Sequence, residues 1–270
     1  MVATLATQGI VALSGMPTVP YFDPAELTLN ADIHKYWWHY TAPGYTKKET
    51  TLPSDDAAIG DNVGMFLGMP GAAGVGGTAT VGLAKGSVTP CVVAEDGVDV
   101  PSGIFYEVGV RSAVVSSTGF TYGYRTKRLT EGNSGGLMLF NGLDASPRAM
   151  YLTQYGDVIE FGSEWIFGHT TAYDMDPDVS GFEQYHSVVA VFSPGVTPGT
   201  LTLALYVNRV LAASATEYTP SFYDTLNTDR FYSAQTGKTW RLQSRLLLGQ
   251  DITDPVDIDN LFNFLEFGVG

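Results

Sequence analysis

The alternation of hydrophobic and polar positions along the second half of the chain predicts β-strands. Phe120, Tyr122 and Tyr124 alternate with smaller residues, which is the period-two pattern of a half-buried strand. After a polar turn, residues 137–140 form a short apolar run between glycines, which predicts the next strand. Further strands are predicted at 104–115, 149–154, 158–161, 186–192, 201–207, 210–214 and 240–249.

Strands at this spacing, without a sustained amphipathic helix, favour an all-β sandwich. Gly156-Asp157 and Asn208-Arg209 are predicted to be hairpin turns between successive strands. One short helix is predicted near 259–265, with Asp257 or Asp259 as its N-cap.

The first hundred residues carry a weaker strand pattern. Residues 17–24 hold three prolines, which exclude a helix there, so we interpret this segment as an extended arm or linker. Residues 58–92 are rich in Gly, Ala and Val, and a strand at 75–83 is weakened by glycine. We therefore predict a sandwich at 103–270, preceded by an extended Pro/Gly-rich region at 1–100 that docks on another surface or adds strands.

Several of these segments resemble laminin G-like domains, which belong to the concanavalin A-like superfamily. The strand Phe120-Thr-Tyr-Gly-Tyr-Arg-Thr, followed by a strand that ends in Asn141-Gly142, is similar to the strand–turn–strand core of that family. Residues 185–192 and 203–213 resemble its stretch W-H-x-V-x-V … L-Y-V-D-G, and Leu246-Leu-Leu-Gly249 resembles its later strand L-x-I-G.

The resemblance covers roughly residues 103–267 and has two departures from the family pattern. Tyr185 stands where the family often has Trp, and Asn208-Arg209 replaces Asp-Gly. The resemblance implies a concanavalin A-like (laminin G-like) jelly-roll β-sandwich, a fold that usually binds ligands rather than transforming them.

Composition and charge narrow the function classes. The chain has 270 residues, of which 44% are hydrophobic and 16% charged, so it can bury a large core. The net charge of −14 and the 14 basic residues against 28 acidic ones disfavour a nucleic-acid partner. The longest basic cluster, Arg125-Thr-Lys-Arg128, is interpreted as a solvated strand end.

Cys91 is the single cysteine of the sequence, and its apolar surroundings predict a buried thiol without an intrachain disulfide. The N-terminus lacks the basic and apolar regions of a signal peptide, and no apolar run reaches the roughly 18 residues of a membrane span. We expect no membrane insertion. Either a soluble intracellular protein or a virion protein assembled in the host cytoplasm fits this pattern.

Two motifs suggest catalysis and are both incomplete. Gly132-Asn-Ser-Gly-Gly136 resembles the nucleophile loop of chymotrypsin-like proteases, but no histidine stands in that family's setting. The alternative is a polar hairpin loop. A second possible catalytic motif consists of Asp157, Glu160 and Glu164, which resemble the carboxylates of concanavalin A-like glucanases. Residues 157 and 160 face opposite sides of a regular strand, so their carboxylates cannot act as a pair without a bulge.

Asp174, Asp176 and Asp178 resemble a D-x-D-x-D calcium loop, because oxygen ligands at alternate positions can surround a hard cation. Val179 and Tyr185 replace the Gly and Glu of an EF-hand, so an EF-hand is excluded. An acidic surface loop is the alternative. Ca²⁺ is therefore the cofactor that the sequence suggests, and no other cofactor motif is complete.

Trp37, Trp38 and Tyr40 are candidates for stacking on sugar rings, because aromatic faces suit the apolar side of a pyranose. Adjacent residues of a strand point to opposite sides, so at most one Trp is expected to be exposed. The alternative is that these residues belong to the core.

Our leading hypothesis is a non-enzymatic virion structural protein, a bacteriophage decoration, fibre or tail-associated component with a lectin-like sandwich at the virion surface. Its partners would be other virion proteins, copies of itself and cell-surface glycans. The alternatives are an extracellular, cellular carbohydrate-binding or adhesion module, and a glycoside hydrolase.

Overall fold

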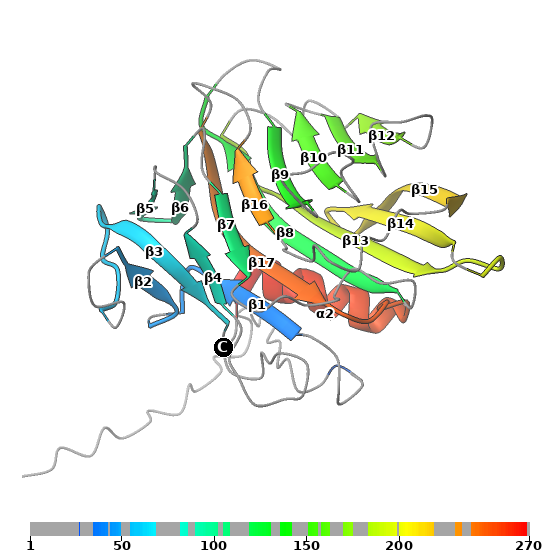
Figure 1. Cartoon of the computed structure of the whole chain (residues 1–270), viewed down its shortest axis with the longest axis horizontal. Coiled ribbons are helices and arrows are strands. Elements are labelled where there is room, and N and C mark those ends of the chain that lie inside the picture. Colours follow the sequence, from blue (N-terminus) through cyan, green and yellow to red (C-terminus); the bar gives the residue numbers. More distant parts are fainter. Residues whose placement is uncertain are drawn as a thin grey trace, which may run out of the picture.

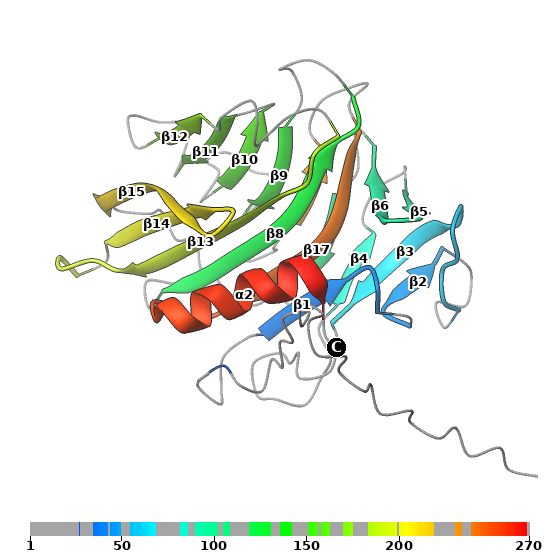
Figure 2. The ribbon, with the colours of Figure 1, turned by 180° about the vertical axis from the view of Figure 1, so that it is seen from behind.

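The computed structural model describes most of the β-structure and the C-terminal helix. The described residues are 27, 35–42, 44–49, 55–68, 82–85, 90–101, 105–108, 119–130, 136–141, 151–155, 158–162, 170–174, 183–198, 200–218, 230–233 and 239–268. Every strand pairing among them is antiparallel, and two sheets pack against each other with the helix on the outer side of one sheet (Figures 1 and 2). The prediction of an all-β jelly-roll-like sandwich is confirmed, and the described residues include the helix predicted near the C-terminus.

One layer, which we call the front sheet, has β17 and β8 at its centre. Its strands are, in spatial order, β1 (Lys35–His39), β17 (Trp240–Leu248), β8 (Phe120–Arg128), β13 (His186–Pro194), β14 (Leu201–Val207) and β15 (Val210–Tyr218). The first residues of β17 pair with β6 (Gly97–Val100), on the same edge on which β1 pairs with its later residues.

The other layer, the back sheet, runs from β2 to β12. Its strands are, in spatial order, β2 (Thr46–Lys48), β3 (Asn62–Leu67), β4 (Gly82–Lys85), β7 (Phe105–Val108), β16 (Arg230–Ser233), β9 (Gly136–Asn141), β10 (Tyr151–Tyr155), β11 (Val158–Gly162) and β12 (Thr170–Asp174). Strand β5 (Cys91–Ala94) pairs with both β3 and β6, so it connects the two layers.

The front sheet sends alternate side chains into the space between the layers. Phe120, Tyr122 and Tyr124 of β8 are fully buried there, as their period-two pattern predicts. The ring of Phe120 stacks on that of Phe192 with 4.2 Å between the centroids. Cys91 is buried in the same core, which confirms the prediction of a buried thiol.

The opposite face of the front sheet is covered by α2 (Pro255–Phe267), which lies across β8, β13 and β17 (Figure 2). Leu261, Phe262 and Leu265 of the helix pack on Val189 and Leu246 of the sheet. The last residues of β17, Leu246 to Leu248, are therefore buried on both sides of the sheet, which explains the run of three leucines there.

The start of α2 differs from the sequence-based prediction. The N-cap is Asp254, whose Oδ1 accepts hydrogen bonds from the backbone N–H of Val256 at 2.8 Å and of Asp257 at 3.4 Å. Pro255 follows at the first helical position, where its missing N–H is not needed. The helix therefore begins before Asp257 and Asp259, the two predicted caps.

The turn between β14 and β15 confirms the predicted hairpin at Asn208-Arg209. Both residues have positive φ values, 46° and 70°, which the type I′ turn requires. Arg209 also reaches α2, where it donates hydrogen bonds to Asp259 and, at 2.8 Å each, to Asn263 and Glu266. The turn thus fixes the hairpin to the helix.

Strands from the first hundred residues share hydrogen-bonded sheets with strands after residue 103, because β1 and β6 both pair with β17. The strand predicted at 104–115 includes β7 over Phe105–Val108, and the one predicted at 75–83 overlaps β4 at residues 82–83. The rest of both predicted strands lies outside the described residues. The proposed arm at 17–24 and the loop at 132–135 lie outside the described residues.

No helix in the described part is long and apolar enough to span a membrane.

Candidate functional site

A β-bulge in β17 directs polar side chains to the outer side of the front sheet. The register against β8 shifts between Leu242 and Ser244, so Gln243 is an additional residue on this strand. Leu242 belongs to the inner core, whereas Ser244 faces α2 and donates a hydrogen bond to the carbonyl of Leu265 at 2.6 Å. Gln243 lies on the outer side too, because the bulge changes which side chains point inward.

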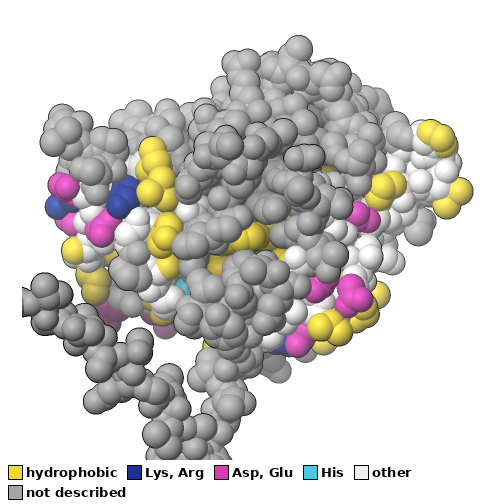
Figure 3. Space-filling model, turned by 90° about the horizontal axis from the view of Figure 1, so that it is seen from below, with side chains coloured by type: hydrophobic (Ala, Val, Ile, Leu, Met, Phe, Trp, Pro, Cys, Tyr) yellow, Lys and Arg dark blue, Asp and Glu magenta, His cyan; other side chains and the backbone are white. Residues whose placement is uncertain are grey.

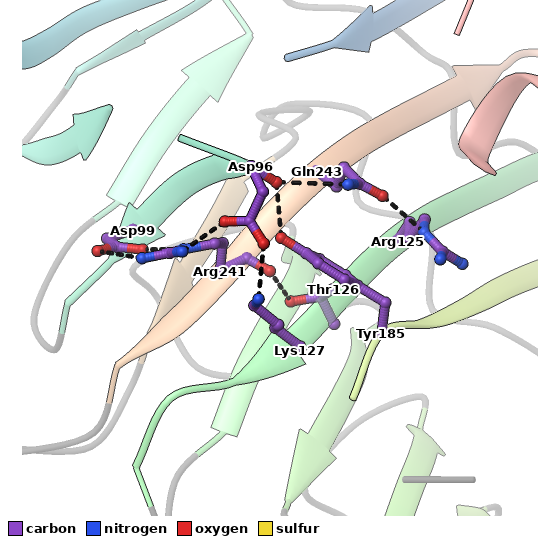
Figure 4. A network of polar contacts seen from close by, with 8 residues as sticks. All are labelled: Asp96, Asp99, Arg125, Thr126, Lys127, Tyr185, Arg241 and Gln243. Atoms are coloured by element: carbon purple, nitrogen blue, oxygen red, sulfur yellow. Dashed lines mark hydrogen bonds and ion pairs between the residues drawn. The ribbon is translucent and has the colours of Figure 1, made fainter. Parts of the chain in front are cut away.

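Beside this bulge, the outer side of the front sheet is no longer covered by α2, and its side chains are polar instead of apolar. We call this surface the outer polar face, and Figure 4 shows how its side chains converge from β8, β17, β6, the β5–β6 turn and the residue before β13. It consists of Asp96, Asp99, Arg125, Lys127, Tyr185, Arg241 and Gln243.

Ion pairs neutralise the acidic part of the outer polar face. Asp96 accepts a hydrogen bond from Nζ of Lys127 at 2.7 Å and another from Arg241. Arg241 also donates from Nε to Oδ1 of Asp99 at 2.6 Å. Burial opposes the ionisation of Asp96, but the hydrogen bonds from Lys127 and Arg241 outweigh it and lower its pKa. Asp96 is therefore a fixed anion and not a proton donor.

Tyr185 connects the acidic and basic parts of this face. Its hydroxyl donates a hydrogen bond to the backbone carbonyl of Asp96 at 2.7 Å. Nζ of Lys127 lies 4.5 Å from the ring centroid, and the guanidinium carbon of Arg125 lies 5.2 Å from it. Burial, followed by the charge of Asp96, raises the pKa of Tyr185, so the hydroxyl stays protonated. Gly97 leaves room for this contact, because a Cβ there would lie 3.2 Å from the Tyr185 hydroxyl and 2.7 Å from the carbonyl of Leu242.

Arg125 is held at the centre of the sheet by neutral partners. Its Nε donates to Oε1 of Gln243 at 2.6 Å, and its Nη1 donates to Oγ of Ser187 at 2.8 Å. Burial lowers the pKa of Arg125, although an arginine remains charged at neutral pH. The interpretation of residues 125–128 as a solvated strand end is wrong, because Arg125 is partly buried and Arg128 is buried.

A pocket of about 310 Å³ adjoins the outer polar face. It is lined by backbone and small side chains, with Tyr40, Asp56, Ile59 and Glu95 as its larger side chains. The backbone N–H of Tyr40 donates to the carbonyl of Gln243 at 2.9 Å, so Gln243 lies between this pocket and Arg125. We call it the Tyr40 pocket. Its lining combines the ring of Tyr40 with small apolar side chains and with the hydroxyl-bearing Thr41 and Thr46, a mixture of apolar and polar groups that is common in small-molecule sites.

The structure places the three aromatic candidates in different environments. Trp38 is fully buried, donates from Nε1 to Thr46 Oγ1 at 3.0 Å and packs edge-on against Phe66. Trp37 is buried in the cluster beneath α2. Neither indole has an exposed face for a sugar, because both sides of β1 are covered, and the core alternative holds for both residues. Tyr40 is half-buried and lines the pocket, so its role in glycan binding stays a prediction.

The predicted calcium loop falls mostly outside the described residues. Asp174 is the last residue of β12, and Asp176 and Asp178 lie beyond the described part. Within the described part no group of three acidic, His or Cys side chains is arranged to hold a metal ion. Calcium binding by the Asp174 loop therefore remains a prediction.

The carboxylates compared with those of glucanases are also mostly outside the described part. Asp157 and Glu164 lie outside the described residues, and Glu160 is in β11.

Sequence reasoning missed Arg125 and Gln243 as members of a site. The basic run at 125–128 was visible, but the bulge that aims Gln243 at Arg125 leaves no local sequence mark. Gly97 was the available signal, because a glycine at the start of a strand often marks a close approach of other groups.

Comparison with known proteins bears on the fold. No protein-family model matches the chain, and no curated protein matches it. Among solved structures, the binding domain of botulinum neurotoxin DC in complex with SialylT is 10% identical, with a TM-score of 0.54 over 84% of this chain and 52% of that one. The binding domain of botulinum neurotoxin serotype D/C, VPI 5993, is 10% identical, with a TM-score of 0.55 over 84% of this chain and 53% of that one. The receptor-binding domain of botulinum neurotoxin type G is 8% identical, with a TM-score of 0.53 over 77% of this chain and 51% of that one.

This chain therefore spans about half the length of the solved chains that it resembles. At such low identity the likeness concerns the β-sandwich fold. That the sandwich belongs to the laminin G-like domains in particular stays a prediction.

Proposed function

We propose that this chain is a non-catalytic, lectin-like binding domain that recognises a glycan in the Tyr40 pocket. The observation that carries the proposal is the juxtaposition of this pocket with the outer polar face through Gln243. A sugar needs hydrogen-bonding groups in fixed positions next to an aromatic ring, and the sheet holds both kinds of group there. The solved structures with the same fold, which are described as binding and receptor-binding domains, support the same class of function.

The electrostatics of the site support binding rather than hydrolysis. A glycosidase needs one carboxyl group with a raised pKa as its acid. In the outer polar face Asp96 has a lowered pKa, and Asp99 is fixed by Nε of Arg241 at 2.6 Å. Acidic and basic side chains also lie next to each other on the surface seen in Figure 3.

Blocking the pocket tests this proposal. Ala58 is exposed and lines the pocket, so Ala58→Trp should fill it and reduce glycan binding by about tenfold or more without unfolding the protein. Binding is measured first on a glycan array and then by calorimetry with the best glycan. Val196→Trp is the matched control, because Val196 is 95% exposed in the β13–β14 turn, away from the pocket. Equal binding by both variants would exclude this pocket, and no binding by the wild-type chain to any glycan would contradict the proposal.

We further propose that the binding domain is displayed on a virion, as a bacteriophage decoration, fibre or tail-associated component. The absence of a disulfide framework and the Pro-rich segment at 17–24, suited to docking, support this assignment. A cellular adhesion module is the alternative. Native mass by light scattering, with and without EDTA, separates them: a defined oligomer supports an assembly component, and its dissociation by EDTA would assign structural calcium. A monomer that does not respond to EDTA would favour the free-standing module.

A further inference from the structure

Arg125 differs from the neighbouring cations in its partners. Lys127 and Arg241 contact Asp96, and Arg209 contacts Glu266 at 2.8 Å. In the described part of the chain the guanidinium of Arg125 contacts only Gln243, Ser187 and the ring of Tyr185, which are all neutral. Glu266 acts on Arg125 from a longer range, and its contacting partner is Arg209. A partly buried cation with no contacting anion is costly for a protein to maintain.

The sheet fixes the orientation of this guanidinium. Arg125 lies in β8, opposite Ser187 of β13 and Ser244 of β17, so its backbone is held from both sides. The bonds from Nε to Gln243 and from Nη1 to Ser187 then fix the plane of the side chain. One hydrogen of Nη1 and both hydrogens of Nη2 have no acceptor among the described residues. At the end of a guanidinium Nη1 and Nη2 each carry a hydrogen that points away from the side chain, and this pair of parallel donors matches a carboxylate.

The neighbourhood of this donor pair suits a sugar. Gln243 separates Arg125 from the Tyr40 pocket, because its side chain holds Arg125 while its carbonyl accepts the N–H of Tyr40. Gln243 thus connects the pocket wall at Tyr40 to Arg125, whose guanidinium carbon lies 5.2 Å from the centroid of the Tyr185 ring. Asp56 in the pocket lining is paired with Nζ of Lys47 at 2.5 Å, so Glu95 is the lining residue whose charge disfavours an anionic group inside the pocket. The charge of a ligand therefore belongs on the Arg125 side.

We propose that Arg125 binds the carboxylate of an acidic sugar unit, while a neutral part of the same glycan occupies the Tyr40 pocket. This inference rests on the proposed glycan-binding function and specifies its ligand class. The carboxylate would accept two hydrogen bonds, from Nη1 and Nη2, and would supply the anion that Arg125 lacks among its described partners. Arg125 would thus distinguish acidic from neutral glycans.

A matched pair of glycans tests the proposal, with 3′-sialyllactose as the acidic probe and lactose as the neutral one. A second pair, methyl glucuronide and methyl glucoside, distinguishes recognition of a carboxylate in general from recognition of sialic acid alone. We expect wild-type protein to bind the acidic member of at least one pair about tenfold or more tightly than the neutral member. Equal affinity for both members of each pair would overturn the inference.

Two variants attribute the preference to Arg125. Arg125→Gln removes the charge, and Arg125→Lys keeps the charge but lacks the two parallel donors. Both should lose about tenfold more affinity for the acidic probe than for the neutral probe, with melting curves establishing that each is folded. Lys48→Gln, which removes one positive charge from an ion pair outside the site, should keep the preference. A preference retained by folded Arg125→Lys would overturn the proposed geometry.

Failure of this inference differs from failure of the proposed function. Binding of neutral glycans without any preference for acidic ones would overturn the role of Arg125 and leave the lectin-like function intact. The absence of binding to every glycan on an array would contradict both.

Discussion

At the scale of the residue, the core contains polar side chains that burial keeps in one protonation state. His186 is fully enclosed, its Nε2 lies 2.9 Å from Oε1 of Gln154, and the hydroxyl of Tyr124 donates to the same oxygen at 3.1 Å. Burial lowers the pKa of His186 from 6.5 to about 3 and that of His39 to about 4. Both histidines are thus neutral in the folded chain at pH values where an unfolded chain already binds protons.

This difference predicts a loss of stability in mild acid. Above pH 6.5 the two histidines are neutral in both states, and their contribution is fully present. As the pH falls below 6.5 toward 4, the unfolded chain binds protons that the folded chain excludes, so the free energy of unfolding decreases. Urea unfolding at a series of pH values measures this decrease.

The carboxylates change the free energy of unfolding in a lower pH range than the histidines. A loss of stability between pH 6.5 and 4 can therefore be assigned to the histidines. The pKa of Asp96 is lowered from 3.8, so its contribution is lost only as the pH falls below about 3.8. A decrease between pH 6.5 and 4 that is halved in His186→Gln would support the histidine assignment. Constant stability over that window would contradict the burial of both imidazoles.

At the scale of the element, the sequence predicted strands well wherever one face of the strand meets the core. The prediction for β14 matches Leu201–Val207, and its burial alternates residue by residue. The hairpin at Asn208-Arg209 was also predicted, because few residues tolerate positive φ at both positions of such a turn. The bulge at Gln243 was not predictable, since an additional residue in a strand follows from tertiary packing and not from local propensity.

The start of the helix allows a direct comparison of two aspartates. Asp254→Ala removes the acceptor of the Val256 N–H and should cost about 1 kcal/mol of stability. Asp257→Ala should cost less stability. Burial and the nearby charge of Asp254 raise the pKa of Asp257, so its carboxylate contributes little to the stability of the helix start. Thermal unfolding of the two variants at neutral pH gives the comparison. A larger loss for Asp257→Ala would place the cap where the sequence suggested it.

At the scale of the whole molecule, segments far apart in sequence form a common core. Trp38, Val98 and Val100 from the first hundred residues are buried together with Tyr122 and Leu247. Position 103 was predicted as a domain boundary because strand signals become regular there, whereas hydrogen bonds between β1, β6 and β17 are not visible in a local pattern. The same limit applies to the site, in which residues 96, 125, 185 and 243 meet only after folding.

This shared core predicts that residues 103–270 do not fold alone. Without β1 and β6, one edge of β17 and part of the inner core would be exposed to water. We expect the fragment to lack a cooperative thermal transition under conditions in which the 270-residue chain shows one. Calorimetry of both proteins measures it, and a cooperative transition of the fragment would show that the sandwich is independent of the first hundred residues.

The most direct test of the glycan-binding account is a crystal structure of the protein with the glycan that binds most tightly on an array. We expect electron density for the sugar in the Tyr40 pocket, with one carboxylate oxygen within hydrogen-bonding distance of Nη1 of Arg125 and the other within that distance of Nη2. A glycan bound elsewhere on the sandwich, with the pocket and Arg125 in contact with water only, would contradict it.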